Sequence, residues 1–174
     1  AHKLGDETKQ KKWRDHAESM RDEILNRAWN EKLQSFTESF DNEFLDASLL
    51  LMHQFGIIDP RDERYVKTVK KIGETLMHKD LLYRYVNEDD FGKAEVAFTI
   101  CTFWYIEALH GIGETQKARE LFEKLLAQRN HVGLLSEDID FETGALWGNF
   151  PQTYSMVGII NCAYFLSQSW DDVL

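Results

Sequence analysis

The chain has 174 residues, of which 43% are hydrophobic and 13% aromatic, a composition typical of a folded globular domain and not of a disordered segment. Its formal net charge of -10 disfavours nucleic acid and anionic membrane surfaces as partners, because like charges repel. No apolar run is long enough to span a bilayer and no signal-peptide pattern opens the chain, so we expect a cytoplasmic protein.

The cysteines and histidines give no indication of a metal site. Cys101 and Cys162 both lie inside apolar stretches, and we expect them to be free, buried thiols. No CxxC or HxxxH spacing occurs. The sequence therefore predicts no metal and no cofactor.

The first half of the chain is predicted to contain three helices. Apolar residues recur at three- and four-residue spacing over residues 7–29, which indicates an amphipathic helix. A broken stretch follows from Asn30 to Glu43, and Asp46 then precedes a short apolar helix over residues 47–51. The turn at residues 59–62 leads into a third helix, whose apolar stripe consists of Val66, Val69, Ile72 and Leu76.

The second half is predicted to contain three more helices. A polar and aromatic loop at residues 83–92 precedes a segment over 94–109 that is apolar nearly all round, as in a buried helix. A further amphipathic helix ends near Arg129, and a long acidic loop follows over residues 131–150. Loops of that length are often functional. The last helix is expected from about Pro151 to Ser167.

These elements predict an all-α chain of six helices in consecutive antiparallel pairs, with an open edge and no strand alternation. No compositional linker divides the sequence, so we expect one domain over residues 1–174.

Two loops combine acidic and aromatic residues in a way that suits a sugar. The first contains Tyr83, Arg84 and Tyr85, and the second contains Glu137 and Asp138. Aromatic faces cover the C–H faces of a pyranose, while carboxylates and guanidinium groups bind its hydroxyls. Cleavage of a glycosidic bond needs two carboxyl groups that flank it. Composition alone nevertheless supports only a helical domain, because most acidic loops are simply solvated.

Five segments, in the same order and spacing, resemble glycoside hydrolase family 15, the glucoamylase-like enzymes. They are GLLSEDIDFETG at 133–144 with GNFPQ at 148–152, LDASLL at 45–50, YRY at 83–85, EVAFTICTFW at 95–104 and ARELFEKLL at 118–126. Together they cover nearly the whole chain. The resemblance implies about half of an (α/α)6 toroid, and an inverting hydrolase that acts on α-linked glucose in glucans, oligosaccharides or trehalose.

The resemblance also implies roles for particular residues. Glu137 matches the family's general base, which activates the attacking water. The positions that match substrate-binding residues are Tyr83, Arg84, Glu95, Asp46 and Tyr154, with Ser155 beside the last. Asp138 stands where the family usually has Glu or Gln, and Met156 where bacterial members usually have His.

The family's general acid lies in a Trp-Glu motif, and the resemblance begins downstream of it. We therefore expect the isolated chain to be incomplete and poorly active or inactive. Cutting a toroid leaves two uncovered helix edges, so we expect self-association or pairing with the missing N-terminal half. The apolar residues expected at these edges are Trp13, Met20, Ile24, Ile159, Ile160, Tyr164, Phe165 and Trp170.

Other interpretations of the same residues stay open at this point. The chain could be a non-catalytic helical-repeat module that binds a protein or a sugar, although no period near 34 residues recurs. A degenerate sugar-binding half-barrel is a third interpretation. Asp46 and Ser136 could simply cap helices or turns, Arg84 could pair with Glu88 or Asp89, and Phe103 and Trp104 could belong to the core.

Overall fold

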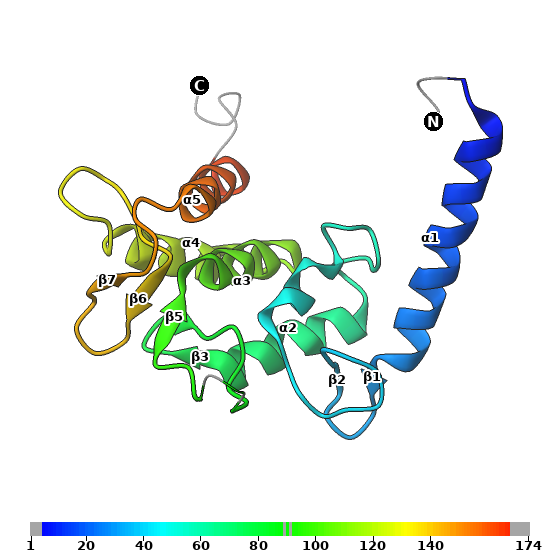
Figure 1. Cartoon of the computed structure of the whole chain (residues 1–174), viewed down its shortest axis with the longest axis horizontal. Helices are drawn as coiled ribbons and strands as arrows, with labels where there is room; N and C mark the ends of the chain where they lie inside the picture. Colours follow the sequence, from blue (N-terminus) through cyan, green and yellow to red (C-terminus); the bar gives the residue numbers. More distant parts are fainter. Residues whose placement is uncertain (1–4, 89, 91, 168–174) are drawn as a thin grey trace.

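The computed structural model describes residues 5–88, 90 and 92–167. All six predicted helices are present within them (Figure 1). Their bounds are α1 Glu7–Arg27, η2 Ala47–Met52, α2 Glu63–Leu76, α3 Thr99–Gly111, α4 Thr115–Leu126 and α5 Thr153–Leu166, where η2 is a 3-10 helix. None of these helices is long and apolar enough to cross a membrane.

The expectation of a purely α-helical chain is wrong, because short antiparallel strand pairs lie between the helices. Two hairpins are formed by β1 Trp29–Asn30 with β2 Ser35–Phe36, and by β3 Met77–His78 with β4 Leu81–Leu82. A three-stranded sheet has the order β5-β6-β7 and consists of Val96–Phe98, Asp138–Asp140 and Leu146–Trp147.

The sheet β5-β6-β7 corrects two predicted boundaries. Residues 96–98, which were expected to begin the buried helix, form a strand, and α3 begins only at Thr99. The predicted long loop contains β6 and β7. Both differences have the same cause: Ala97 pairs with Ile139, so each segment satisfies its backbone groups through a partner about 40 residues away in the sequence.

Helix α3 is the centre of the fold. It packs against α4, α5 and η2, and to a smaller extent against α2 (Figure 1). Ten of its 13 residues are buried. The contact with α5 is close, because a β-carbon at Gly158 would come within 2.4 Å of the Phe103 ring. Phe103 and Trp104 are core residues, as one interpretation of the sequence predicted.

Helix α1 stands apart from this core and projects away from the rest of the molecule (Figure 1). None of its residues is buried, and Trp13 and Met20 are 61% and 63% exposed. Its C-terminal part reaches the body: Arg21 Nε donates a hydrogen bond of 2.8 Å to the Ile57 carbonyl, and Ile24 and Leu25 pack against the core.

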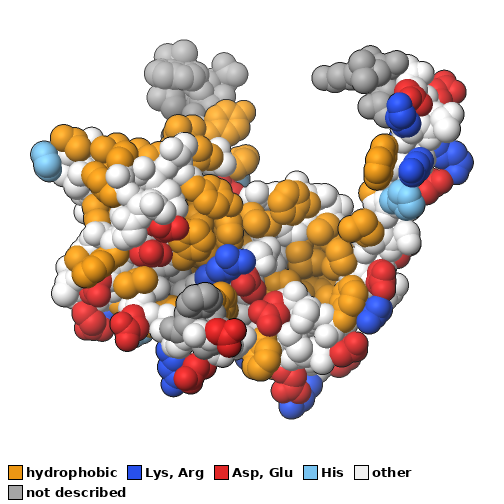
Figure 2. Space-filling view, viewed as in Figure 1, with side chains coloured by type: hydrophobic (Ala, Val, Ile, Leu, Met, Phe, Trp, Pro, Cys, Tyr) orange, Lys and Arg blue, Asp and Glu red, His pale blue; other side chains and the backbone are white. Residues whose placement is uncertain are grey.

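The outer face of α5 is also apolar and uncovered. Ile160 and Tyr164 are 66% and 77% exposed, and Phe165 is close to half-exposed. Hydrophobic side chains also gather in the middle of the face in Figure 2, over the region of α3 and α5, with charged side chains along the lower rim. Two residues expected at the uncovered edges, Ile24 and Ile159, are instead half-buried against the core. Trp170 lies outside the described residues.

Candidate active site

The loops that carry the candidate residues are bonded to the first turns of the inner helices. The Ala47 N–H, at the start of η2, donates to the Arg84 carbonyl at 2.8 Å. The Thr99 N–H, at the start of α3, donates to the Glu137 carbonyl at 2.9 Å. These N–H groups have no partner within their own helices, so the loops satisfy them and are fixed in return.

Helix α5 is joined to the same loop through Ser155. Its hydroxyl, which is buried, donates a hydrogen bond of 2.8 Å to the carbonyl of Ser136 or to the side-chain oxygen of Gln152. The Ser136 hydroxyl bonds the Asp138 carbonyl, so Ser136 closes a turn, as one interpretation predicted. The starts of α3 and α5 thus lie on either side of Glu137.

The Glu137 carboxylate is oriented by the residue that follows Gly148. Its Oε2 atom accepts hydrogen bonds from the backbone N–H and the side-chain amide of Asn149, at 3.1 and 2.7 Å. Gly148 has a φ of +76°. A β-carbon there would lie 2.9 Å from Glu137 Oε2 and 3.0 Å from Glu137 Cβ, so this position requires glycine.

Asp138 places a second carboxyl group against the same glycine. Its Oδ2 atom would lie 2.9 Å from a β-carbon at Gly148. Burial, and then the negative charge of Glu137, raise the pKa of Asp138 to about 6. The two neighbouring carboxyls therefore differ: Glu137 receives two hydrogen bonds, whereas Asp138 is desolvated beside it.

Asp46 and Arg84 form an ion pair close to these carboxyls. Asp46 is buried and caps η2, since its Oδ1 accepts a hydrogen bond from the Ser48 N–H at 2.7 Å. Its Oδ2 accepts a hydrogen bond of 3.2 Å from Arg84 Nε. The cap that the sequence suggested is thus confirmed, and it coexists with an ion pair that the sequence did not suggest. The sequence suggested Glu88 or Asp89 as the partner of Arg84. Within the described residues Arg84 pairs with Asp46 and not with Glu88, and Asp89 lies outside them.

The Cys101 thiol connects the two groups of charged residues. Burial raises its pKa, with a further contribution from the charges of Asp46 and Asp138, while Arg84 opposes the shift. The start of η2 is bonded to Arg84, the start of α3 is bonded to Glu137, and the two helices pack against each other. Chemically, this is a region with oriented carboxylates and one half-exposed guanidinium.

The remaining candidate residues are placed differently. Tyr83 packs on Phe141, with ring centroids 4.3 Å apart, and is part of the packing around the core. Glu95 is exposed and precedes β5. The adjoining strand residue, Val96, pairs with Asp140, at the end of β6 away from Glu137. Tyr154 is half-exposed at the start of α5 and contacts the Trp104 ring edge-on.

Sequence reasoning did not single out Asn149, the residue that orients Glu137. A signal existed in the GNFPQ segment, whose glycine and asparagine lie opposite the GLLSE segment across the β6–β7 hairpin. Within the described residues, no group of three or more His, Cys, Asp or Glu side chains could hold a metal ion.

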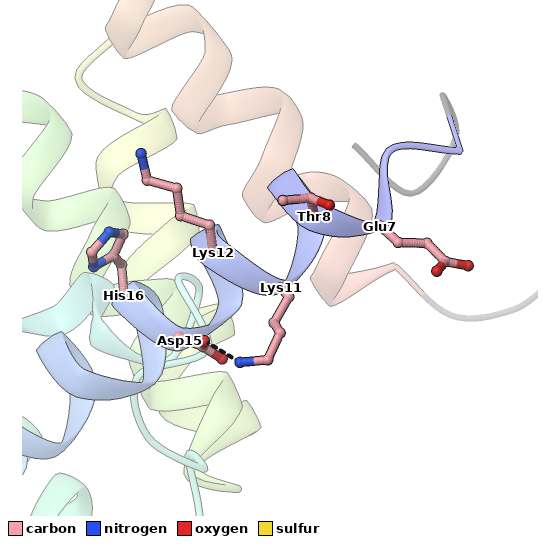
Figure 3. Close-up of a pocket in the computed structure, with 6 residues that line it drawn as sticks. All are labelled: Glu7, Thr8, Lys11, Lys12, Asp15 and His16. Carbon is pink, nitrogen blue, oxygen red and sulfur yellow. Dashed lines mark hydrogen bonds and ion pairs between the residues drawn. The ribbon is translucent and has the colours of Figure 1, made fainter.

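A groove elsewhere in the molecule has a different character. It runs along the exposed part of α1 and is lined by Glu7, Thr8, Lys11, Lys12, Asp15 and His16 (Figure 3). All six side chains come from one helix, and Lys11 pairs with Asp15 at 2.6 Å. Since α1 and the β6–β7 hairpin lie at opposite ends of the molecule (Figure 1), this groove belongs to the helix surface and not to the Glu137 region.

Comparison with known protein families gives a match over most of the chain. The model described as "Glycosyl hydrolases family 15" matches residues 1–164. The trehalase of Thermoplasma acidophilum is 37% identical over 161 residues, which cover 92% of this chain and 28% of that protein. The trehalase of Mycobacterium tuberculosis is 36% identical over 164 residues, which cover 92% and 24%. The chain therefore spans about a quarter of the length of these relatives.

Solved structures show the same fold. A wild-type glycosidase superposes with a TM-score of 0.74 at 17% identity, over 87% of this chain and 43% of that one. A variant glycosidase in complex with glucose gives a TM-score of 0.75 at 15% identity, with the same coverage.

Proposed function

The chain belongs to glycosyl hydrolase family 15, and from this premise we propose that it carries the general-base side of an inverting α-glucoside hydrolase site. The observation that carries the proposal is the Glu137 carboxylate, which both N–H donors of Asn149 orient through a single oxygen. Its other oxygen, Oε1, accepts no hydrogen bond within the described residues.

In this mechanism Oε1 of Glu137 accepts a proton from a water molecule. The water oxygen forms a bond to the anomeric carbon from the side opposite the leaving group, and the configuration inverts. Arg84 binds sugar hydroxyls, with its guanidinium positioned by the buried Asp46 carboxylate. Tyr154 offers a half-exposed ring at the start of α5. Tyr83 and Glu95 are the remaining candidate sugar ligands: Tyr83 packs on Phe141, and Glu95 is exposed just before β5.

The leaving oxygen also needs a proton, and we assign that general acid to a part of the hydrolase outside these 174 residues. In an inverting site the two carboxyls stand roughly 6.5–9.5 Å apart, with the water between them and the substrate. The support for this assignment is that the matched residues cover only 28% and 24% of the related trehalases.

For the fold, we propose that residues 1–174 are a single partial catalytic domain, equivalent to half of an (α/α)6 toroid. Helices η2, α3 and α5 are its inner members, and α1, α2 and α4 its outer ones. Support comes from the packing of α3 between η2 and α5, and from the likeness to a glycosidase that covers less than half of that chain.

Trehalose is the substrate to test first, because the curated relatives are named trehalases. Starch-type and dextran-type oligosaccharides are the comparison substrates. Inverting attack on one half of trehalose releases one β-glucose and one α-glucose, so the anomers observed by NMR immediately after cleavage report the stereochemistry.

The decisive experiment uses α-glucosyl fluoride, whose leaving group needs little protonation. The purified chain is expected to release fluoride and β-glucose. Glu137→Gln is expected to lower the rate by about 10²–10⁴-fold, the usual contribution of general-base catalysis. Glu142→Gln is the matched control, because Glu142 lies on the same hairpin but is exposed and paired with Lys79.

Equal rates for the chain and Glu137→Gln would overturn the assignment of the base. Glucose binding without any fluoride release would favour the sugar-binding half-barrel. With trehalose itself, the chain is expected to be far slower than a complete relative. Robust trehalose turnover that Glu137→Gln abolishes would place the general acid within these 174 residues.

A further inference from the structure

We propose that Asp138 is a positioning residue of the base site, whose negative charge assists proton transfer to Glu137 and switches with pH. This inference rests on the proposed function, since it presumes that Glu137 is the base. Asp138 touches neither the water nor the scissile bond in this role, and acts through the carboxylate beside it.

The geometry brings the two carboxyl groups together despite their adjacency in the chain. Successive residues of a strand point to opposite faces, but Glu137 precedes β6, which begins at Asp138. One oxygen of each carboxyl lies 2.9 Å from the point that a β-carbon at Gly148 would occupy. The two oxygens therefore lie within the distance of about 6 Å over which like charges shift one another's pKa.

The other groups around Asp138 leave Glu137 as its strongest charged neighbour. Its cross-strand partners, Phe98 on β5 and Trp147 on β7, carry no charge. Helix α3 presents the Cys101 thiol, whose raised pKa keeps it neutral. Asp46 and Arg84, which also act on Cys101, are paired with each other.

The environments of the two carboxyls differ. Asn149 donates two hydrogen bonds to Glu137 Oε2 and fixes the orientation of that carboxylate. Burial raises the pKa of Asp138 to about 6, and Glu137 contributes to that shift. Neighbouring carboxyls held in unlike environments characterise acid–base sites.

The consequence for catalysis follows from the sign of the charge. As the pH rises through about 6, Asp138 becomes negative. The added charge makes it easier for Glu137 to accept the water proton, and it stabilises the positive charge that develops on the sugar ring. Below that pH Asp138 is neutral, and both effects disappear.

The first test is an NMR titration of the side-chain carboxyls in the isotope-labelled full chain. Asp138 is expected to titrate near pH 6. In Glu137→Gln its midpoint should fall by about 1 unit, because one of the two causes is removed, while Glu142→Gln should leave it unchanged. A midpoint near the ordinary aspartate value, or one that does not respond to Glu137→Gln, would overturn the proposal.

The second test is the pH profile of α-glucosyl fluoride hydrolysis. Asp138→Asn is expected to lower kcat by about tenfold at neutral pH, with little change in KM, and to remove the step near pH 6. Asp138→Glu, which keeps the charge, should restore both the rate and the step. If Asp138→Asn hydrolyses the substrate as fast as the parent chain at neutral pH, the charge of Asp138 has no role.

Failure of this inference is distinguishable from failure of the proposed function. If Glu137→Gln abolishes hydrolysis and Asp138→Asn does not alter the pH profile, the base stands and the assisting role falls. If Glu137→Gln leaves hydrolysis unchanged, the base assignment itself is wrong, and the role of Asp138 falls with it even where the NMR coupling is present.

Discussion

Helices α1 and α3 differ in what holds them together. α1 has 21 residues, none of them buried, and is supported by a cap from Asp6 and by ion pairs such as Lys11–Asp15 and Arg27–Glu23. α3 has 13 residues, ten of them buried among η2, α4 and α5. Helical stability in proteins comes mostly from such packing. The candidate site is attached to α3, the well-packed helix. The apolar stripe of α1 is left exposed.

The largest expected contrast comes from removing one aromatic ring from each helix. Phe103→Ala empties a fully buried position between α4 and α5, and should cost about 3–5 kcal/mol of unfolding free energy. Trp13→Ala removes a ring that is 61% exposed, and should change stability by less than about 0.5 kcal/mol. Urea unfolding followed by circular dichroism measures both. A large loss for Trp13→Ala would mean that the α1 stripe is covered in solution.

The next prediction concerns what covers the exposed apolar faces of α1 and α5 in solution. We expect the purified chain to self-associate at micromolar concentration, or to bind the remainder of the hydrolase, through α1 and the outer face of α5. Ile160 is 66% exposed, and burial of such a side chain contributes about 1.5–3 kcal/mol. Ile160→Lys should therefore weaken self-association at least about tenfold in light scattering.

Lys124→Ile serves as the control, since Lys124 is exposed on α4, away from α1 and the outer face of α5, and pairs with Asp80. A monodisperse monomer that binds no hydrophobic dye would contradict the prediction. It would mean that the chain itself covers both faces, and the proposed half-toroid would then have to be abandoned.

The sequence predicted the helices because their periodicity is local. It missed the strands because each is only two or three residues long, too short for an alternating pattern. Val96–Phe98 also continues directly into the apolar run of α3, so only its distant partner on β6 identifies it as a strand. The pairing of Arg84 with Asp46, 38 residues away, was missed for the same reason.

Burial was the other limit on prediction from the sequence. The stripe of α1 has the spacing of a buried face, yet the helix reaches the core only near its C-terminal end, through Ile24 and Leu25. Periodicity shows which side of a helix is suited to burial. Whether that side is buried depends on whether another element packs against it. Likewise, Asp138 looked like a mild substitution until the fold placed it and Glu137 against Gly148.

A smaller effect is expected at Glu107, the buried carboxyl of α3. It accepts a hydrogen bond from Gln54 and lies 4.0 Å from the Cys162 sulfur. Burial raises its pKa, against hydrogen bonds from Gln54 and Asn161. The protonated form of Glu107 is therefore the one that stabilises the folded chain. Its contribution to the free energy of unfolding is complete below the ordinary glutamate pKa and is lost as the pH rises through the raised pKa.

Glu107→Gln should accordingly raise the melting temperature at neutral pH, and the difference from the parent chain should vanish near about pH 4. Glu123→Gln, at an exposed position on α4, is the matched control and should show no such trend. A Glu107→Gln variant that is less stable than the parent at neutral pH would show that the ionised form is stabilised where it lies.

The smallest prediction compares the same capping interaction in two helices. The Asp62 carboxylate accepts a hydrogen bond from Arg64 N–H at the start of α2, and Asp6 accepts one from Lys9 N–H at the start of α1, both at 2.9 Å. Replacing Asp62 by Ala should cost about 1 kcal/mol, and replacing Asp6 by Ala should weaken the first turn of α1. Because α2 is anchored by buried side chains such as Ile72, the loss for Asp62→Ala should appear in full in global unfolding. Since α1 is free to fray, the loss for Asp6→Ala should appear only as faster hydrogen exchange in its first turns. An equal loss of global stability from Asp6→Ala would mean that α1 unfolds together with the core, and the contrast between the two helices would be false.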